Sequence, residues 1–338
     1  MDPHATATTL GVAPASLSMS TALNAAIPPV QTLSINLSDR NQQWTASVFP
    51  ANRTTAWLQL SQYSGTGPAQ VSMQATGIGF GPGAYRATVI VTSPNSVPQA
   101  ISVPVMFVNG AAAGTSISGA GNAFSLKPGA APGMILAVYG SGLAGSTAQA
   151  TTQPLPYSLG NVTAAINGVP TPVLYVSPGQ LNVQVPYWVG AGPAVLGVNN
   201  DGRIAGYQFS ISPSAPGILT DGKGVMLPTS TAAQGGLATL YVTGTGEVNN
   251  SSLESGFAPT AGTTVPNLPR PVLPLSVTVG GAQALVQFSG STPGVIGMTQ
   301  VNIIVPSSTA PGSRPVVVTV GGASSPAANL DVTAAQPK

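Results

Sequence analysis

Apolar and polar residues alternate with a period of two along most of the chain, and helical periodicity is almost absent. In residues 31–38, for example, Leu33, Ile35 and Leu37 fall on one face of an extended segment. Because successive side chains of a β-strand point to opposite faces of a sheet, this pattern predicts strands with one buried face. The same alternation recurs, between turns that contain Gly or Pro, in residues 71–75, 85–91 and 101–107. Short strands at this spacing predict a β-sandwich.

The rest of the chain contains an internal duplication. Residues 180–186 (QLNVQVP) return as residues 300–306 (QVNIIVP), 120 positions later. Upstream of these segments, residues 135–142 (ILAVYGSG) match residues 238–246 (ATLYVTGTG). Two pairs of segments that match in the same order predict two copies of one domain.

The alternation within the repeated segment also predicts which side chains face the domain cores. Asn182 and Asn302 are expected to point outward or to bond neighbouring backbone, because they alternate with apolar residues. The side chains expected to face the two cores are Leu181, Val183 and Val185 in the first copy and Val301, Ile303 and Val305 in the second.

These patterns together predict an all-β protein made of three tandem immunoglobulin-like β-sandwich domains. The boundary between the two copies is placed near residues 212–217, where Pro213 and Pro216 interrupt the alternation. A segment rich in Gly, Ala and Ser after the first sandwich is expected to be a linker. The expected division is a sandwich over 1–109, a linker over 110–121, a sandwich over 122–215, and the duplicate sandwich over 216–338 with a short C-terminal tail.

Several short motifs in residues 7–108 are similar to those of BACON-type immunoglobulin-like domains. They are Trp44-Thr45-Ala46-Ser47, Trp57-Leu58, Ser64-Gly65-Thr66-Gly67 and Pro82-Gly83-Ala84-Tyr85 before a final valine-rich strand. The resemblance implies the immunoglobulin-like fold and, through the role proposed for BACON domains, a link to carbohydrate binding.

Residues 123–333 resemble an uncharacterised C-terminal domain family of secreted acidobacterial proteins. The matching features are Pro132-Gly133 before a strand to Gly140-Ser141-Gly142-Leu143, then Asn167-Gly168-Val169-Pro170-Thr171-Pro172, then residues 180–186. Each half also resembles the TIG/IPT version of the immunoglobulin fold. These resemblances imply a fold and a secreted location, and no activity.

Charge is scarce in this chain, and that scarcity restricts its partners. Lys, Arg, Asp and Glu make up 5% of the residues, whereas about 25% is typical of globular domains. The few basic residues are scattered, so the basic patch needed to bind nucleic acid is missing. No apolar run reaches the length of a membrane span, and none is expected. A surface of small polar residues is common in secreted proteins, so an extracellular or cell-surface location is expected, with any signal peptide removed.

The inventory of reactive residues argues against an enzyme. His4 is the only histidine and there is no cysteine, so no catalytic triad, imidazole or thiolate metal site, or cofactor is expected. Glu247 and Glu254 lie in one loop-rich stretch and could approach as a glycosidase pair. No aromatic sugar platform flanks them, so we interpret them as solvated loop residues.

Three Gly-containing motifs are interpreted as turns. Residues 140–145 fit the pattern G-x-G-x-x-G of dinucleotide-binding loops, but the residues that follow have no helical period. Asp201-Gly202 and Asp221-Gly222 could be fragments of calcium loops, yet Asp-Gly is also a favoured hairpin turn. The turn is the preferred interpretation in each case.

Four aromatic residues are candidates for ligand binding: Trp44, Trp57, Tyr187 and Trp188. The resemblance to BACON-type domains places Trp44 and Trp57 in strands, and a place in the core or at its rim is favoured over a sugar platform. Tyr187 and Trp188 follow Pro186, at a position where the duplicate has two serines. Neighbouring residues of a strand point in opposite directions, so at least one of the pair is expected near the surface. If one of these residues stacks on a sugar or packs between domains, Trp188 is the favoured one, and packing between domains is preferred over stacking on a sugar.

Two functions from different classes fit these observations. The first is a non-catalytic structural or adhesive surface protein that acts as a spacer or assembles into a filament or surface layer. Its homopolymer would form through exposed edge strands and through residues 1–12 added to a neighbour's sheet. The second is a carbohydrate-binding protein that acts through its N-terminal domain, with a glycan as partner.

Overall fold

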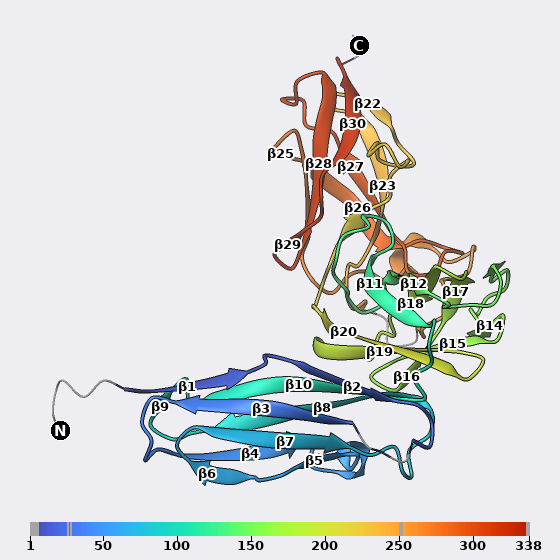
Figure 1. The fold of residues 1–338 in the computed structure, drawn as a ribbon. Helices are drawn as coiled ribbons and strands as arrows, with labels where there is room; N and C mark the ends of the chain where they lie inside the picture. The colour runs from blue at the N-terminus through green and yellow to red at the C-terminus, as the bar shows by residue number, and fades with distance from the viewer. Residues whose placement is uncertain (1–6, 26, 28, 250–252, 336–338) are drawn as a thin grey trace. The chain divides into compact units, whose positions relative to one another are not determined.

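The computed structural model describes residues 7–25, 27, 29–249 and 253–335 (Figure 1). These residues form β-strands β1 to β30, two short 3-10 helices and no α-helix. Among the described helices, none has the length and apolar character needed to cross a membrane. The six sheets form three successive β-sandwiches, so the predicted fold class is confirmed.

The first sandwich packs two five-stranded sheets, with strand orders β5-β7-β3-β1-β9 and β2-β10-β8-β4-β6. Its core contains the predicted inward faces, including Leu33 and Ile35 from β3 and Val71 and Met73 from β7. The strands are β1 (Thr8–Ala13), β2 (Leu17–Thr21), β3 (Val30–Leu37), β4 (Gln43–Phe49), β5 (Leu58–Leu60), β6 (Ser64–Thr66), β7 (Ala69–Ala75), β8 (Gly83–Thr92), β9 (Ser96–Val97) and β10 (Ala100–Asn109), with the 3-10 helix η1 (Arg53–Thr55).

Strand β1 changes the prediction for the N-terminal segment. Thr8–Ala13 pairs with β3 and β9 of its own sheet, and the side chain of Leu10 is buried. Residues 8–12 of the segment predicted to add to a neighbouring molecule therefore belong to the protein's own first sandwich. Residues 1–6 lie outside the described residues, and self-assembly stays a prediction.

The second sandwich contains the five-stranded sheet β11-β12-β18-β17-β13. Strands β14 and β16 pair with β15, and β14 and β15 contact β17 across the core. Residues 116–121, which were predicted as part of a linker, instead form most of β11. The strands are β11 (Ser116–Asn122), β12 (Ile135–Ser141), β13 (Ala148–Gln149), β14 (Ser158–Leu159), β15 (Val162–Ile166), β16 (Val169–Thr171), β17 (Val173–Val176) and β18 (Gln180–Gln184).

The third sandwich packs the sheet β21-β23-β27-β26 against the sheet β22-β30-β28-β24-β25, with β29 paired to β28. Valine, leucine and isoleucine from both sheets fill its core. The elements are β21 (Gly217–Ile218), β22 (Thr231–Ala233), β23 (Leu237–Thr243), η2 (Val265–Asn267), β24 (Leu275–Val279), β25 (Ala282–Gln283), β26 (Leu285–Ser291), β27 (Thr299–Ile304), β28 (Gly312–Val320), β29 (Ala323–Ser324) and β30 (Ala328–Thr333).

Strand pairing confirms that the second and third sandwiches are copies of one domain. Tyr139 of β12 lies opposite Gln180 of β18, and Tyr241 of β23 lies opposite Gln300 of β27. The third strand of each group also carries a register shift at the same place, between residues 173 and 175 and between residues 286 and 288. An irregularity that recurs at equivalent positions is a designed feature of the fold.

The predicted register of the repeated segment is confirmed. Asn182 and Asn302 point away from the cores, and each accepts a hydrogen bond from the glutamine two residues earlier, at 2.9 and 3.0 Å. All six residues predicted to face the cores have no exposed surface: Leu181, Val183, Val185, Val301, Ile303 and Val305.

The chain divides into two compact units. Unit 1 consists of Met1–Ser116 with Ala194–Gln208, and unit 2 consists of Ile117–Pro193 with Phe209–Lys338. The segment Ala194–Gln208 includes most of β19 (Gly192–Asn200) and β20 (Arg203–Ile211).

Within unit 1, the segment Ala194–Gln208 covers an apolar patch on β8 and β10. Val195 and Ile204 pack there against Met106 and Val108. Glycine makes the close approach possible, because a Cβ on Gly206 would lie 2.5 Å from Cγ2 of Val108. The first sandwich is therefore completed by residues far away in the sequence.

Candidate binding site

Trp44 and Trp57 are core residues of the first sandwich. Their exposed fractions are 1% and 0%, and the ring of Trp57 stacks on Phe107 with centroids 5.4 Å apart. Trp44 lies opposite Gly65 of β6, where a Cβ would come within 2.6 Å of the indole. Neither ring offers a face to a sugar, so both are core residues, as the sequence favoured. A glycan partner of the N-terminal domain stays a prediction.

In unit 2, a long loop of the third sandwich packs against the second sandwich. The loop covers residues 244–274, of which 244–249 and 253–274 are described. Its backbone accepts a hydrogen bond at Gly256 from the N–H of Leu155 at 2.8 Å. The N–H of Gly256 donates in turn to Oε1 of Gln184 at 2.6 Å, and Nε2 of Gln184 donates to the carbonyl of Gly133 at 3.1 Å. Gln184 is fully buried. Its Oε1 bonds across the joint between the two copies, and its Nε2 fixes the side chain to its own copy.

A second buried amide closes the same joint. Nδ2 of Asn122 donates to the carbonyls of Ala215 at 2.9 Å and Thr243 at 3.2 Å. The hydroxyl of Thr243 donates to the carbonyl of Gly297 at 2.6 Å and accepts the N–H of Ile135 at 3.0 Å. Buried polar groups that are satisfied in this way fix one arrangement of the parts they join.

Tyr187 and Trp188 point in different directions, as expected for neighbours at a strand end. The N–H of Tyr187 donates to the hydroxyl of Ser255 at 3.0 Å, and its ring covers Gly133, where any Cβ would overlap it. Burial raises the pKa of the Tyr187 phenol to about 12. Trp188 is 58% exposed. Tyr187 therefore belongs to the joint, and Trp188 is left on the surface.

Trp188 lies at the edge of an open depression of about 450 Å³. The two glutamates of the chain, Glu247 and Glu254, both line it. The remaining lining residues are Tyr187, Val248, Asn249 and Leu253. Both glutamates are exposed loop residues, as predicted. The fold nevertheless brings Tyr187 and Trp188 to the same depression from beyond the end of β18, which their place in the sequence did not indicate.

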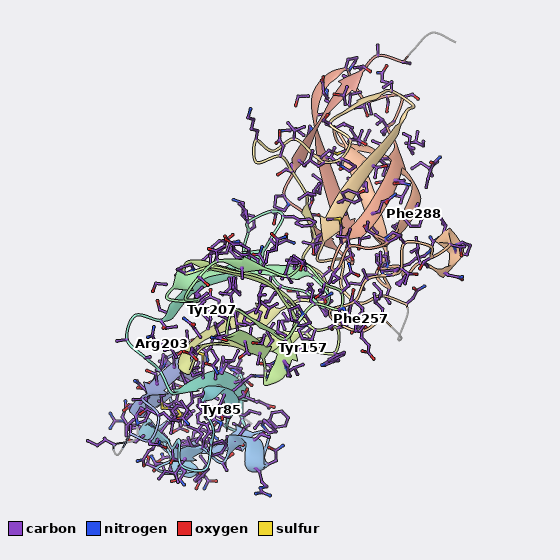
Figure 2. All side chains as sticks on the ribbon, turned by 90° about the vertical axis from the view of Figure 1, so that its right-hand side faces the viewer. Tyr85, Tyr157, Arg203, Tyr207, Phe257 and Phe288 are labelled. Carbon is purple, nitrogen blue, oxygen red and sulfur yellow. The ribbon has the colours of Figure 1, made fainter. Side chains whose placement is uncertain are left out.

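The position of Glu247 is fixed by a short backbone ladder. Its carbonyl accepts the N–H of Val272 at 3.0 Å, and Asn249 exchanges hydrogen bonds with the backbone of Arg270 at 2.8 and 2.9 Å. The guanidinium of Arg270 lies 5.3 Å from the ring centroid of Phe288. Figure 2 labels Phe288 and Phe257 among the side chains drawn. Among the described residues, neither glutamate carboxylate has an ion-pair or hydrogen-bond partner. The depression therefore carries two negative charges that the described part of the chain does not neutralise.

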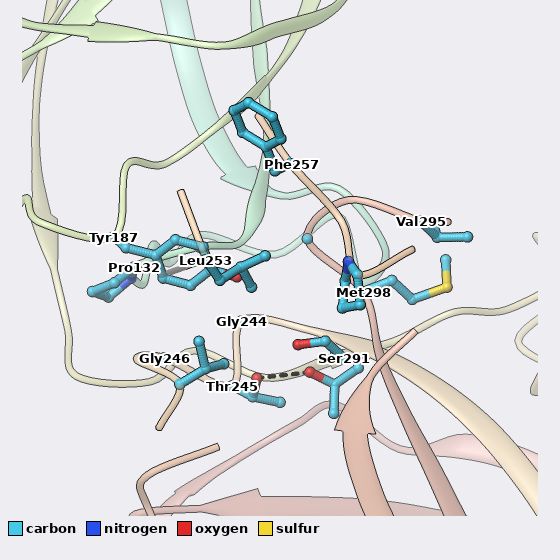
Figure 3. Close-up of a pocket in the computed structure, with 15 residues that line it drawn as sticks. Pro132, Tyr187, Gly244, Thr245, Gly246, Leu253, Phe257, Ser291, Val295 and Met298 are labelled. Carbon is cyan, nitrogen blue, oxygen red and sulfur yellow. Dashed lines mark hydrogen bonds between the residues drawn. The ribbon is translucent and has the colours of Figure 1, made fainter. Parts of the chain in front are cut away.

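Two further hollows border this depression. One is a small cavity of about 10 Å³ beside Tyr187 and Leu253, below which Thr245 and Thr299 share a hydrogen bond of 2.9 Å (Figure 3). It has room for about one water molecule and for no ligand. The other is an open depression of about 460 Å³ that continues past Phe257. It shares Leu253 and Glu254 with the depression beside Trp188.

The remaining motifs behave as turns. Oδ1 of Asp221 accepts the N–H groups of Lys223 and Val225, which lowers the pKa of this carboxyl. Asp201 has a φ of 50° in a hairpin turn, and residues 140–145 lead into no helix. Within the described ranges, no group of three or more His, Cys, Asp or Glu side chains could hold a metal ion. His4 lies outside the described residues.

Differences between the two copies mark this site in the sequence. Those at Tyr187 and Trp188 made these residues candidates, whereas the difference at Gln184 was missed. In the repeated segment and just after it, the two copies differ at five positions, two of which only exchange one apolar residue for another. The other three change the character of the side chain: Gln184 against Ile304, Tyr187 against Ser307, and Trp188 against Ser308. Gln184 and Tyr187 are the residues that receive the loop. Differences between the copies therefore mark where the copies contact each other, and Trp188 is the one of the three that this contact leaves exposed.

Comparisons with known proteins give the chain no family. No protein-family model matches it, and no curated protein matches it. Among solved structures, the I9–I11 tandem of titin overlaps at 10% identity and a TM-score of 0.22, covering 97% of this chain and 100% of that one. Domains 5–6 of the S-layer protein SbsC overlap at 13% identity and a TM-score of 0.22, covering 60% of this chain and 96% of that one.

A xyloglucanase of Bacteroides ovatus from family GH5 overlaps at 16% identity and a TM-score of 0.24. The overlap covers 37% of this chain and 27% of that enzyme. All of these overlaps are loose, so the fold class rests on the sheet topology and the strand registers.

Proposed function

We propose that this chain is a non-catalytic, extracellular structural protein with an adhesive role. The observation that carries the proposal is the joint in unit 2, where the buried side chains of Gln184 and Asn122 each form a hydrogen bond to the other copy, with Gly256 and Thr243. A joint of this kind holds two sandwiches as one body. That property suits a spacer or a load-bearing element.

The chemical inventory supports the same proposal. Catalysis by acids and bases needs groups whose pKa values are tuned to opposite roles. The groups with shifted pKa values do not form such a pair: Tyr85, Arg86 and Tyr187 are shifted by burial, and Asp221 by a turn. The 5% charge content fits a secreted protein with a small-polar surface.

The experiment that tests this proposal locates the chain and measures what it does there. Intact cells that produce the protein are treated with a protease that cannot enter them, and the released peptides are identified. The proposal expects peptides from all three sandwiches and expects cells without the protein to attach less firmly to surfaces. Recovery of the chain only from the cytoplasm, or attachment unchanged by its loss, would contradict the proposal.

A further inference from the structure

Three residues that are rare in this chain come together at the depression beside Trp188. Trp188 is one of three tryptophans, and the other two are buried in the first core. Glu247 and Glu254 are the two glutamates of the whole chain. Charged residues make up only 5% of this protein. Two carboxylates in the same depression as the exposed tryptophan are therefore an uncommon grouping of residues that can bind a ligand.

The two kinds of side chain recognise complementary features of a ligand. An indole face binds apolar ring faces and cations. Carboxylates without a partner bind positively charged donors through short, charge-assisted hydrogen bonds. The ligand that satisfies both has a flat apolar face with a positive charge attached to it.

We propose that this depression binds a glycan with free amino groups. The apolar face of one pyranose ring stacks on Trp188, and the ammonium group of a sugar pairs with Glu247 and Glu254. The inference rests on the proposed adhesive function and names its ligand class.

The shape of the surface favours a polymer of such sugars over a single cation. The depression has a volume of about 450 Å³, and the adjoining one, about 460 Å³, shares Leu253 and Glu254 with it. A lysine side chain would fill a small part of this space, whereas pockets for small-molecule ligands have volumes of roughly 300–1,000 Å³. Consecutive amino sugars would extend from Trp188 past Glu254 toward Phe257.

The test measures binding of three probes to the full chain by calorimetry. The first is a tetramer of glucosamine, the second is its fully N-acetylated and uncharged counterpart, and the third is a short lysine-containing peptide. The proposal expects the glucosamine tetramer to bind at least about tenfold more tightly than either of the others. Its binding should weaken as salt is added, because two ionised groups are paired with it.

The variants Trp188→Ala, Glu247→Gln and Glu254→Gln should each weaken this binding, the first by about tenfold. Phe49→Ala removes an aromatic ring of similar exposure, 57%, from the first sandwich and should leave binding unchanged. Because Trp188 is exposed, its variant should melt at the temperature of the parent chain.

If the acetylated tetramer binds as tightly as the glucosamine tetramer, the glutamates do not pair with ammonium groups of the ligand. If the peptide binds as tightly as the glucosamine tetramer, the ligand is not specifically a glycan. Absence of binding by all three probes would overturn the inference as a whole. The cell-attachment experiment tests the proposed function and uses no added glycan. Loss of glycan binding with attachment intact would therefore contradict this inference alone, and unchanged attachment in cells without the protein would contradict the proposed function.

Discussion

Replacing Gln184 by Leu tests whether the joint between the two copies contributes to stability. The leucine has a similar volume, so the change removes hydrogen bonds without opening a large cavity. The carbonyl of Gly133 and the N–H of Gly256 lose their partner inside a site with no exposed surface. An unsatisfied buried polar group costs about 1–3 kcal/mol. Two of them predict a loss of about 2–6 kcal/mol in the free energy of unfolding of unit 2, less where water enters the joint.

The assay is urea unfolding followed by circular dichroism and by tryptophan fluorescence, with the slope of the transition compared between variants. The matched control is Gln153→Leu. Gln153 also donates to a backbone carbonyl, that of Gly294 at 2.6 Å, but at an exposed site where water replaces the lost bond. The control should change the free energy of unfolding by less than about 0.5 kcal/mol. If Gln184→Leu behaves like the control, the joint is not a stabilising contact and the argument built on it fails.

Three further predictions concern stability. Ile303→Ala should lower the free energy of unfolding by about 2–5 kcal/mol, because it leaves a cavity among fully buried neighbours in the third core. Thermal and urea unfolding measure the loss, and an unchanged melting temperature would mean that the register of β27 is assigned wrongly. Gly206→Val should destabilise unit 1 by about 1–3 kcal/mol through overlap with Val108, whereas Gly190→Val, where a Cβ meets nothing within 4 Å, should not. Tyr187 ionises with a pKa of about 12 in the folded chain and 10.0 ordinarily, so the unfolded state loses its proton first and stability should fall as pH rises from about 10 to 12. Tyr187→Phe should make that fall shallower, and an identical pH profile would contradict the buried phenol.

The fold could be predicted from the sequence because its cores follow a simple rule. Residues such as Leu181 and Ile303 alternate with polar neighbours, and a strand with one buried face demands that alternation. The duplication reinforced the register, since two copies repeat it. The extent of β11 was missed because Gly, Ala and Ser carry little pattern, and its pairing with β12 is decided by tertiary contacts.

The candidate site could be predicted only in part. Trp188 was identified because its position differs between the copies, and adjacent strand residues must diverge. Its association with Glu247 and Glu254 depends on a loop of the other copy, which lies about sixty residues further along the chain. No local pattern encodes that approach. For Trp44 and Trp57 the sequence suggested candidates that the structure does not support. They lie in motifs that resemble those of BACON-type domains, but both side chains are buried in the core.

Native-state hydrogen exchange of the Ile303→Ala chain tests most directly whether the two copies act as one body. The substitution lies in β27 of the third sandwich, and the readout is the protection of amides in β18 of the second. The account predicts that the free energy of opening falls by similar amounts in β18 and β27, because the buried joint couples their unfolding. Loss of protection in β27 with β18 unchanged would show that the copies open independently, which would contradict the single structural body proposed for unit 2.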